Sequence, residues 1–315
     1  MNGDGPRVVA LGGGHGLAAS LEALRLVTEH LTAVVTVADD GGSSGRLRQE
    51  LTALPPGDLR MALAALAGRD EWATTWTALF QHRFPGTGPL AGHAVGNLVL
   101  TALYDVAGSP VAALDLAGRL LGAAGRVLPL TTADIDIVAA VAGLDPDPRV
   151  VTEVRGQVEV ATTRGRVIAV HLEPAEPPGC PESVQAILDA DWVVLGPGSL
   201  FTSVIPHLLV PDIRAALDKS PARRVLALNL VAQTGETSGF SPAAHLDAVA
   251  GHAPDLRVDF VIADTRVLDR GGLMEAAAAL GAEVRYADVA ATGQEARHDA
   301  DLLAMAYREL MRPGP

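Results

Sequence analysis

The stretch RVVALGGGHGLAASLEAL at residues 7–24 decides the fold class of this chain. It reads as a short apolar strand, a glycine-rich loop and a helix whose leucines recur at helical spacing. Residues 32–38 (TAVVTVA) follow as a nearly continuous apolar strand, which is typical of a parallel strand covered on both faces. The chain therefore opens with the βαβ unit of an α/β protein.

The same alternation of strand and helix returns at residues 192–262. The same alternation of strand and helix on both sides of the middle region favours one domain over two, and no linker-like segment separates the two sides. We predict a single α/β domain over residues 1–315, Rossmann-like, with a mostly parallel sheet and helices on both faces. A closing helix is expected at residues 297–311.

The middle of the chain has a different character. Helical patterns dominate residues 59–121, with a break at 84–92, and Asp58 is placed to cap the first helix. From about residue 127 to 180, alternating β-branched residues suggest short antiparallel strands beside the main sheet. We expect a mixed α+β insertion there.

Composition excludes several classes of protein. The 315 residues are 49% hydrophobic, which predicts a globular fold. Aromatic residues make up 3% and the formal charge is −13, so a nucleic-acid partner is not expected. Cys180 is the single cysteine, and neither a signal peptide nor an apolar run long enough to insert into a membrane is found. We expect a cytoplasmic protein, and the composition permits a homodimer.

The first glycine loop, residues 12–16, follows the first strand. Glycines there let the backbone approach a phosphate at the start of the helix, with His15 as the one side chain in the loop. Leu17 stands where a dinucleotide fingerprint requires its third glycine, and a P-loop is absent. The alternative is a tight strand-to-helix turn. As phosphate-binding candidates we take Gly13, Gly14 and His15.

The serine loop, residues 39–46, follows the second strand. Its glycines, two hydroxyls and a cation suit phosphate oxygens, and two adjacent carboxylates beside an anion site suggest a divalent cation between them. Asp39 also stands about where a nicotinamide-binding protein places its ribose-binding acid. The alternative is a solvated turn. The candidates are Asp39, Asp40, Gly42, Ser43, Ser44 and Arg46.

Later loops add weaker candidates. The second glycine loop, residues 196–199, resembles another backbone cradle for an anion, although a strand-ending turn would look the same. Residues four apart at 93 and 97 would share a helix face, and neutral polar groups near residues 229–237 suit a base or a sugar. The candidates are His93, Asn97, Gly196, Gly198, Ser199, Asn229 and Thr234.

These loops together predict a diphosphate-bearing ligand, such as a nucleotide sugar or a nucleoside diphosphate ester. We expect the serine loop and the second glycine loop to face the same diphosphate, because the carboxyl ends of parallel strands meet at one edge. Covalent catalysis and zinc binding are not indicated, and no catalytic residue is assigned.

The motifs at these positions resemble those of the YvcK/GlmR family. They run in order from about residue 7 to 252, and Arg297-His298-Asp299 is similar to a further family motif. The chain differs from the usual family pattern at His15 and at Ala94-Val95. The matching segments are GGGHGL (12–17), VTVADDGGSSGRLR (35–48), PPGDLR (55–60), QHRF (81–84), GHAVGN (92–97), GPGSLFTSVIP (196–206) and QTGETSGFS (233–241).

This resemblance implies a gluconeogenesis factor within the superfamily of 2-phospho-L-lactate transferase (CofD). Such proteins bind UDP-sugars of the UDP-N-acetylglucosamine class and link carbon supply to cell-envelope (peptidoglycan) precursor synthesis and cell shape, in some cases by acting on glucosamine-6-phosphate synthase. The resemblance further implies that Arg297 reaches the sugar nucleotide. The residues it implies at the diphosphate are Gly13, Gly14, Ser43, Ser44, Gly198 and Ser199.

The principal expectation is therefore a UDP-sugar-binding regulator that requires no cofactor. The rival is a magnesium-dependent transferase of the 2-phospho-L-lactate type, for which the resemblance implies Asp40 and Asp58 at the Mg²⁺ ion. A nicotinamide-dependent enzyme is the third alternative, supported by Asp39 and opposed by Leu17.

Overall fold

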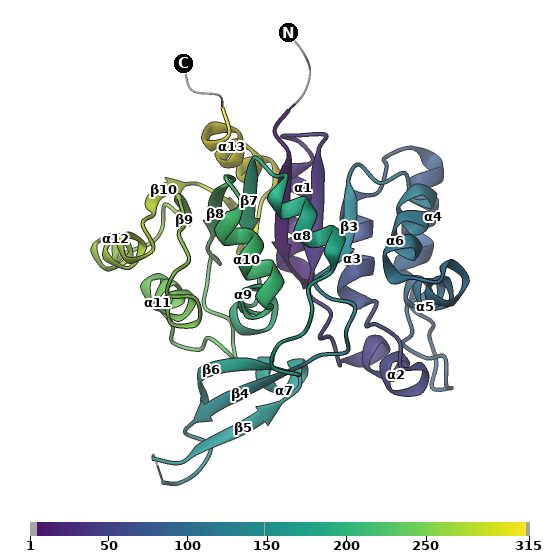
Figure 1. Cartoon of the computed structure of the whole chain (residues 1–315), viewed down its shortest axis with the longest axis horizontal. Helices are drawn as coiled ribbons and strands as arrows, with labels where there is room; N and C mark the ends of the chain where they lie inside the picture. The colour runs from purple at the N-terminus through teal and green to yellow at the C-terminus, as the bar shows by residue number, and fades with distance from the viewer. Residues whose placement is uncertain (1–4, 148, 313–315) are drawn as a thin grey trace.

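A computed structural model of the chain describes residues 5–147 and 149–312. At its centre is a seven-stranded parallel sheet of order β10-β9-β8-β7-β1-β2-β3 (Figure 1). This architecture confirms the predicted Rossmann-like α/β fold. The strands are β1 (Val8–Gly12), β2 (Leu31–Val35), β3 (Arg126–Pro129), β7 (Trp192–Leu195), β8 (Arg223–Ala227), β9 (Phe260–Asp264) and β10 (Glu283–Ala287).

Helices cover both faces of the sheet. Helix α1 (Gly14–Leu24) packs against α3 (Gly57–Leu66) and α13 (Ala300–Leu310) on one face. On the other face, α8 packs against α10, and α9 and α12 pack against α11. The bounds of these helices and of the adjoining π-helical turn are α8 (Pro181–Leu188), η1 (Leu200–Val204), α9 (Ile205–Leu209), α10 (Pro211–Lys219), α11 (Pro242–His252) and α12 (Arg270–Ala279).

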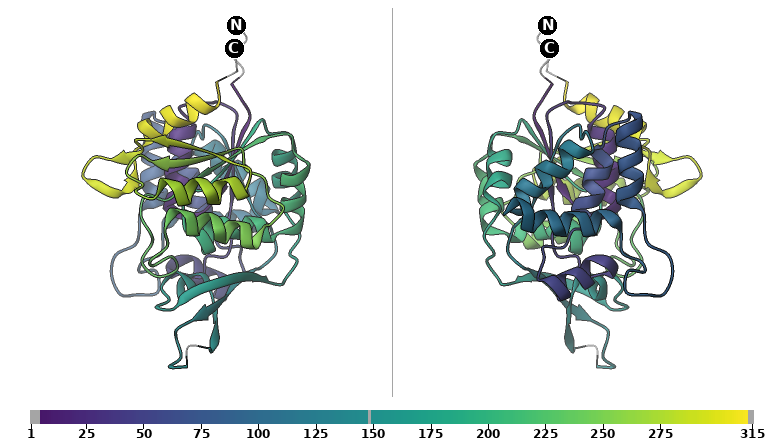
Figure 2. Two further views of the ribbon diagram at one scale, coloured as in Figure 1. Left: turned by 90° about the vertical axis from the view of Figure 1, so that its left-hand side faces the viewer. Right: turned by 90° about the vertical axis from the view of Figure 1, so that its right-hand side faces the viewer.

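The remaining helices precede or adjoin α3. Helix α2 carries most of the serine loop, and α4, α5 and α6 form the helical region predicted between residues 59 and 121 (Figure 2). Their bounds are α2 (Gly42–Leu51), α4 (Glu71–Gln81), α5 (Val95–Ala107) and α6 (Pro110–Leu120).

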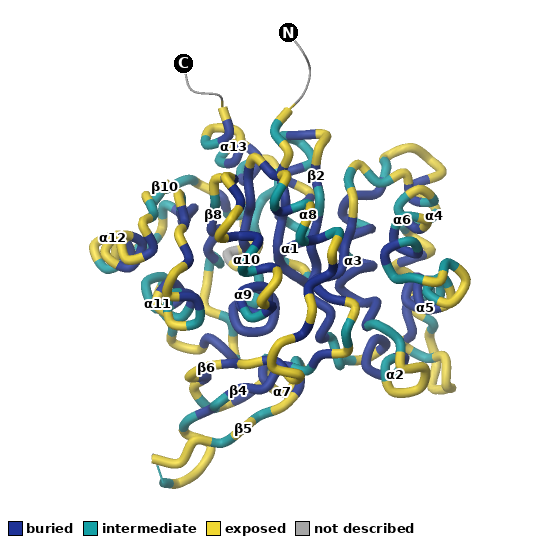
Figure 3. Tube along the Cα trace, in the orientation of Figure 1, coloured by how far each residue is buried: buried dark blue, intermediate teal, exposed yellow. Residues whose placement is uncertain are grey.

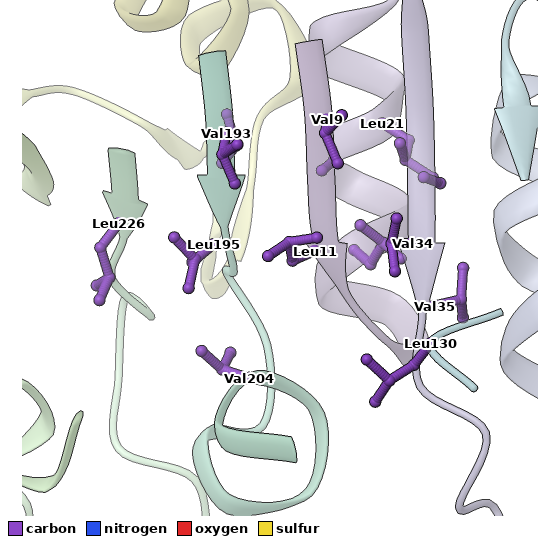
Figure 4. Close-up of a cluster of buried hydrophobic side chains, with 14 of the residues drawn as sticks. Val9, Leu11, Leu21, Val34, Val35, Leu130, Val193, Leu195, Val204 and Leu226 are labelled. Atoms are coloured by element: carbon purple, nitrogen blue, oxygen red, sulfur yellow. The ribbon is translucent and has the colours of Figure 1, made fainter. Parts of the chain in front are cut away.

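The core lies between the sheet and its two helical layers. Every residue of β1 and β7 is buried, because both strands are covered on both faces (Figure 3). Val9 and Leu11 of β1 pack beside Val193 and Leu195 of β7, and Leu21 of α1 points to the same region (Figure 4). The apolar strand pattern of the sequence thus fixes the centre of the sheet.

A separate three-stranded antiparallel sheet lies beyond the carboxyl ends of the main strands, opposite the termini (Figure 1). Its order is β5-β4-β6, and a short helix, α7, connects β5 to β6. The bounds are β4 (Asp136–Ala142), β5 (Val151–Arg155), α7 (Gln157–Ala161) and β6 (Arg166–Glu173). The insertion was expected from about residue 127, but β3 pairs with β2 in the main sheet, so the antiparallel strands begin only at β4.

Two further expectations were wrong in detail. Asp58 does not cap α3, because Pro56 occupies the N-cap and Asp58 lies inside the first turn. The closing helix begins at Ala300, since Arg297 and His298 end strand β12 (Gln294–His298), which pairs with β11 (Ala290–Ala291). Among the described residues, no single helix is long and apolar enough to cross a membrane. Only the pair of segments Leu200–Leu209 and Pro211–Lys219, bent by 75° at the break between them, has the length and composition of a membrane span.

The strand order places the ligand site. On one side of β1 the sheet continues with β2 and β3. On the other side it continues with β7, β8, β9 and β10, so the order in which strands are added reverses between β1 and β7. Open α/β sheets bind ligands at such a switch point, outside the carboxyl ends of the two central strands. In this chain those ends carry the first and second glycine loops.

Candidate functional site

The two glycine loops touch at the switch point. A Cβ atom on Gly16 would lie 2.4 Å from both the Cα of Gly198 and the carbonyl oxygen of Pro197. Any larger side chain at position 16 would therefore push the loops apart. Gly198 itself has a φ of +148°, a backbone conformation that favours glycine.

Asn229, which follows β8, holds the second glycine loop in place. Its Oδ1 accepts a hydrogen bond from the Gly198 amide at 2.9 Å, and its Nδ2 donates to the Gly198 carbonyl at 2.7 Å. The sequence predicted a ligand-facing role for Asn229. In the structure both ends of its amide are used by the loop, so the side chain shapes the site as well as lining it.

A cleft of about 620 Å³ opens at these loops. This volume lies within the range typical of small-molecule sites. The wall includes Gln157 of α7, so the antiparallel sheet contributes to the same cleft. The predicted site residues that line it are Gly13, Gly14, His15, Gly198, Ser199, Asn229, Thr234 and Arg297.

The serine loop lies beside the cleft and not in its wall: Asp39 and the Ser44 hydroxyl lie against Gly57, next to the cleft residue Asp58. That the loop faces the same diphosphate as the second glycine loop stays a prediction. Within the described part of the chain, the lining of the cleft includes neither the serine loop nor the helix start near residue 93. Gly196 is also outside the lining, and its φ of +72° ends β7 in a sharp turn. The predicted residues outside the cleft wall are Asp39, Asp40, Gly42, Ser43, Ser44, Arg46, His93, Asn97 and Gly196.

The serine loop also takes part in a buried hydrogen-bond network. The Ser43 hydroxyl lies 2.9 Å from Nδ1 of His93, and the Asn97 amide donates to Ser43 at 3.0 Å. Arg60 donates through Nε to Oδ1 of Asn97 at 2.8 Å. Burial, with a smaller effect of Arg46, lowers the pKa of His93, so the ring is neutral near pH 7. These groups fasten α2, α3 and α5 together.

The three acids of the predicted site have separate surroundings. Asp39 accepts from the Gly41 amide at 3.0 Å, and Asp40 accepts from the Val158 amide of α7 at 3.0 Å. Asp58 lines the cleft and is buried; burial and the nearby Asp39 raise its pKa to about 7, against the opposing hydrogen bond from Thr36.

These surroundings bear on the metal prediction. Asp40 is directed to α7, and the carboxylate that interacts with Asp58 is Asp39. Among residues 5–147 and 149–312, no group of three or more His, Cys, Asp or Glu side chains could hold a metal ion. The side chains present do not form a metal cage, and we derive no chemical step from one.

Sequence reasoning missed several functional candidates. Glu236 is buried behind the second glycine loop, where its carboxylate faces the Thr202 hydroxyl and the amides at Leu200 and Phe201; burial outweighs these contacts and raises its pKa to about 7. Gln157 and Ser203 also line the cleft. Glu236 and Ser203 stand within the motif segments 233–241 and 196–206 but were not selected there, whereas Gln157 lies in the short helix of the insertion, where a single polar residue carries no local pattern.

Comparison with known proteins gives a consistent picture. The family model for 2-phospho-L-lactate transferase CofD matches residues 8–302. A Mycobacterium tuberculosis protein, provisionally named a gluconeogenesis factor, is 55% identical over 94% of this chain and 88% of its own. A Bacillus subtilis protein named gluconeogenesis factor is 40% identical over 79% of this chain and 76% of its own.

A solved structure agrees with these matches. A crystal structure of a UPF0052-family protein from Bacillus halodurans superposes with a TM-score of 0.86 and 34% identity, covering 96% of this chain and 98% of that one. The similarity therefore extends over the sheet, both helical layers and the antiparallel sheet together.

Proposed function

This chain belongs to the CofD family and groups with its gluconeogenesis-factor members, and on that premise we propose that it is a UDP-sugar-binding regulatory protein. The observation that carries the proposal is the contact of the two glycine loops at the switch point of the sheet. Residues of both loops border one cleft, and although the Gly198 amide is engaged by Asn229, glycine loops that precede a helix suit the oxygens of a pyrophosphate.

The other walls of the cleft suit the rest of a nucleotide sugar. Thr234 and Gln233 offer neutral hydrogen-bonding groups of the kind that recognise a base or a sugar. Arg297 of β12 is exposed at the rim and supplies a cation for the two negative charges of a diphosphate. A ligand with a neutral sugar, a diphosphate and a base matches this order of groups.

The proposed role is to report the supply of such a sugar nucleotide to cell-envelope precursor synthesis, with glucosamine-6-phosphate synthase as the proposed partner. The first test is calorimetric titration of the full chain with UDP-N-acetylglucosamine, with and without Mg²⁺. We expect saturable binding at micromolar to millimolar ligand. Absence of both heat and thermal protection at millimolar ligand would contradict the proposal.

A phospholactyl-type transferase is the second candidate, and Asp58 is the observation that favours it. A buried carboxyl group with a pKa near 7 beside the first glycine loop is suited to accept or release a proton at neutral pH. Turnover of a nucleoside diphosphate ester by wild-type protein, abolished in Asp58→Asn, would support this alternative. UDP-sugar binding by the wild-type protein without any turnover would contradict the transferase alternative and support the regulatory proposal.

A further inference from the structure

A second hollow adjoins the cleft and carries motif residues that the proposed function does not use. Its volume is about 490 Å³, and it shares His15 and Met61 with the cleft. Its wall adds Arg60, which ends the PPGDLR segment, and Arg83 of the QHRF segment. We call this space the arginine hollow.

Two guanidinium groups share this wall. Arg60 is 4% exposed and lines the hollow, and the hydrogen bond found for it among the described residues uses Nε and not the two terminal nitrogens. Arg83 donates through one nitrogen to the Gly92 carbonyl. Burial and the nearby charge of Arg83 lower the pKa of Arg60 to about 10, so Arg60 stays charged at pH 7.

The fold holds these cations in place. Arg60 is anchored to Asn97, while the backbone on either side of Arg83 pairs with residues 93 and 95. Asp58 and Asp39 offset part of the Arg60 charge, and an anion in the hollow would further relieve the repulsion between the two guanidinium groups. Among the described residues that line the hollow, Glu22 is the one acid, so arginines outnumber carboxylates there.

We propose that the arginine hollow binds a small metabolite that carries a phosphate monoester, next to the nucleotide cleft. Planar guanidinium groups match the geometry of phosphate oxygens, and Gln81 adds a neutral hydrogen-bonding group. The volume exceeds that of a phosphate ion and leaves room for a carbon skeleton along the small side chains of α1 and α3. This inference rests on the arginines and does not depend on the ligand of the cleft.

The test is calorimetry on the full chain at low ionic strength without nucleotide. Glucose 6-phosphate, inorganic phosphate and glucose are the three probes. We expect saturable binding of glucose 6-phosphate, weaker binding of phosphate and none of glucose. Equal affinity for both anions would indicate an adventitious ion only and would overturn the proposal. Absence of glucose 6-phosphate binding at about 10 mM ligand would mean a dissociation constant well above millimolar and would overturn the proposal as well.

Variants locate the binding. Arg83→Gln should weaken glucose 6-phosphate binding about tenfold, the loss expected from a charge-assisted hydrogen bond. Ala64→Glu, which adds a carboxylate to the wall without removing a hydrogen bond, should weaken it similarly. Arg164→Gln removes an exposed arginine outside the hollow and is the control. Equal loss in all three variants would overturn the proposal.

A parallel titration separates the two sites. UDP-N-acetylglucosamine binding should be retained in Arg83→Gln if the hollow is a distinct site. Loss of UDP-sugar binding in that variant, without any phosphate-ester binding in the wild type, would assign the hollow to the cleft ligand and overturn the proposal. Failure of UDP-sugar binding alone would contradict only the proposed function.

Discussion

The side-chain amide of Asn229 pairs with both the amide and the carbonyl of Gly198, closing a two-hydrogen-bond clamp on the second glycine loop. The clamp joins the end of β8 to the end of β7. Because its oxygen and its nitrogen are both engaged, the side chain is held in one orientation and the loop is in place before a ligand arrives.

Asn229→Asp tests the clamp. The aspartate keeps the shape, loses the donor to the Gly198 carbonyl and adds a negative charge beside the proposed diphosphate. We expect UDP-sugar affinity to fall at least tenfold and the free energy of unfolding to fall by about 1–3 kcal/mol. Calorimetry and urea denaturation measure the two effects. Gln49→Glu adds the same charge at an exposed position of α2, and an equal loss of affinity there would contradict the explanation.

Gly16→Ala tests the contact between the two glycine loops. The new methyl group would meet backbone atoms at 2.4 Å, and backbone cannot rotate away as a side chain can. We expect about 1–3 kcal/mol of destabilisation and a loss of UDP-sugar binding. Gly88→Ala is a matched control, because a Cβ there meets nothing within 4 Å. Wild-type affinity in Gly16→Ala would show that the loops need not touch.

Asp58 gives a pH dependence with a definite sign. Its pKa is about 7 in the folded protein and 3.8 ordinarily, so between these values the native state holds a proton that the unfolded chain has lost. The free energy of unfolding should therefore fall as pH rises between these two pKa values and level off above the higher one. The expected slope is about 1.4 kcal/mol for each pH unit in that window.

Asp58→Asn should lower this slope by the share that Asp58 contributes and leave the share of Glu236, whose pKa is also raised to about 7. Chemical denaturation at pH 5, 6, 7 and 8 would measure the difference. UDP-sugar affinity of the wild type should also fall above pH 7, where the carboxylate faces the diphosphate, and the variant should lose that dependence. Asp218→Asn, on the exposed side of α10, should behave as the wild type. An identical slope in both variants would exclude Asp58 as its source.

Ser43 and Ser199 should respond in opposite ways to removal of their hydroxyls. Ser43 is buried and bonded to His93 and Asn97, so Ser43→Ala should lower the free energy of unfolding by about 1–3 kcal/mol and leave UDP-sugar affinity within about twofold. Ser199 lines the cleft, so Ser199→Ala should weaken binding without comparable destabilisation. Loss of UDP-sugar binding in Ser43→Ala but not in Ser199→Ala would indicate that the serine loop contacts the ligand.

The sequence predicted the centre of the fold well, because parallel strands buried on both faces leave uninterrupted apolar runs followed by glycine. This signal identified β1, β2 and β7 and both glycine loops. It failed at β10, which lies at the edge of the sheet and is only half-buried, so its apolar pattern is weak. β3 was assigned to the insertion because a short edge strand looks alike in either sheet.

The site was predicted in part for a related reason. Hydroxyls and glycines at a strand end suit an anion, but a hydroxyl can equally belong to a buried hydrogen-bond network, as Ser43 does with His93 and Asn97. Which of the two applies depends on contacts between residues some 50 positions apart, and spacing along the chain does not contain that information. Asp58 was recognised only as a helix cap and a metal ligand, since burial cannot be read from its neighbours.

The start of β1 and the end of α13 lie at the amino ends of the parallel strands, on the side of the sheet away from the glycine loops (Figure 2). A fluorescent reporter or an affinity handle attached to the last turn of α13 would therefore lie away from the ligand's approach. Paired donor and acceptor dyes, one on α13 and one on the antiparallel sheet, would report a change in the distance between these two elements when a sugar nucleotide binds.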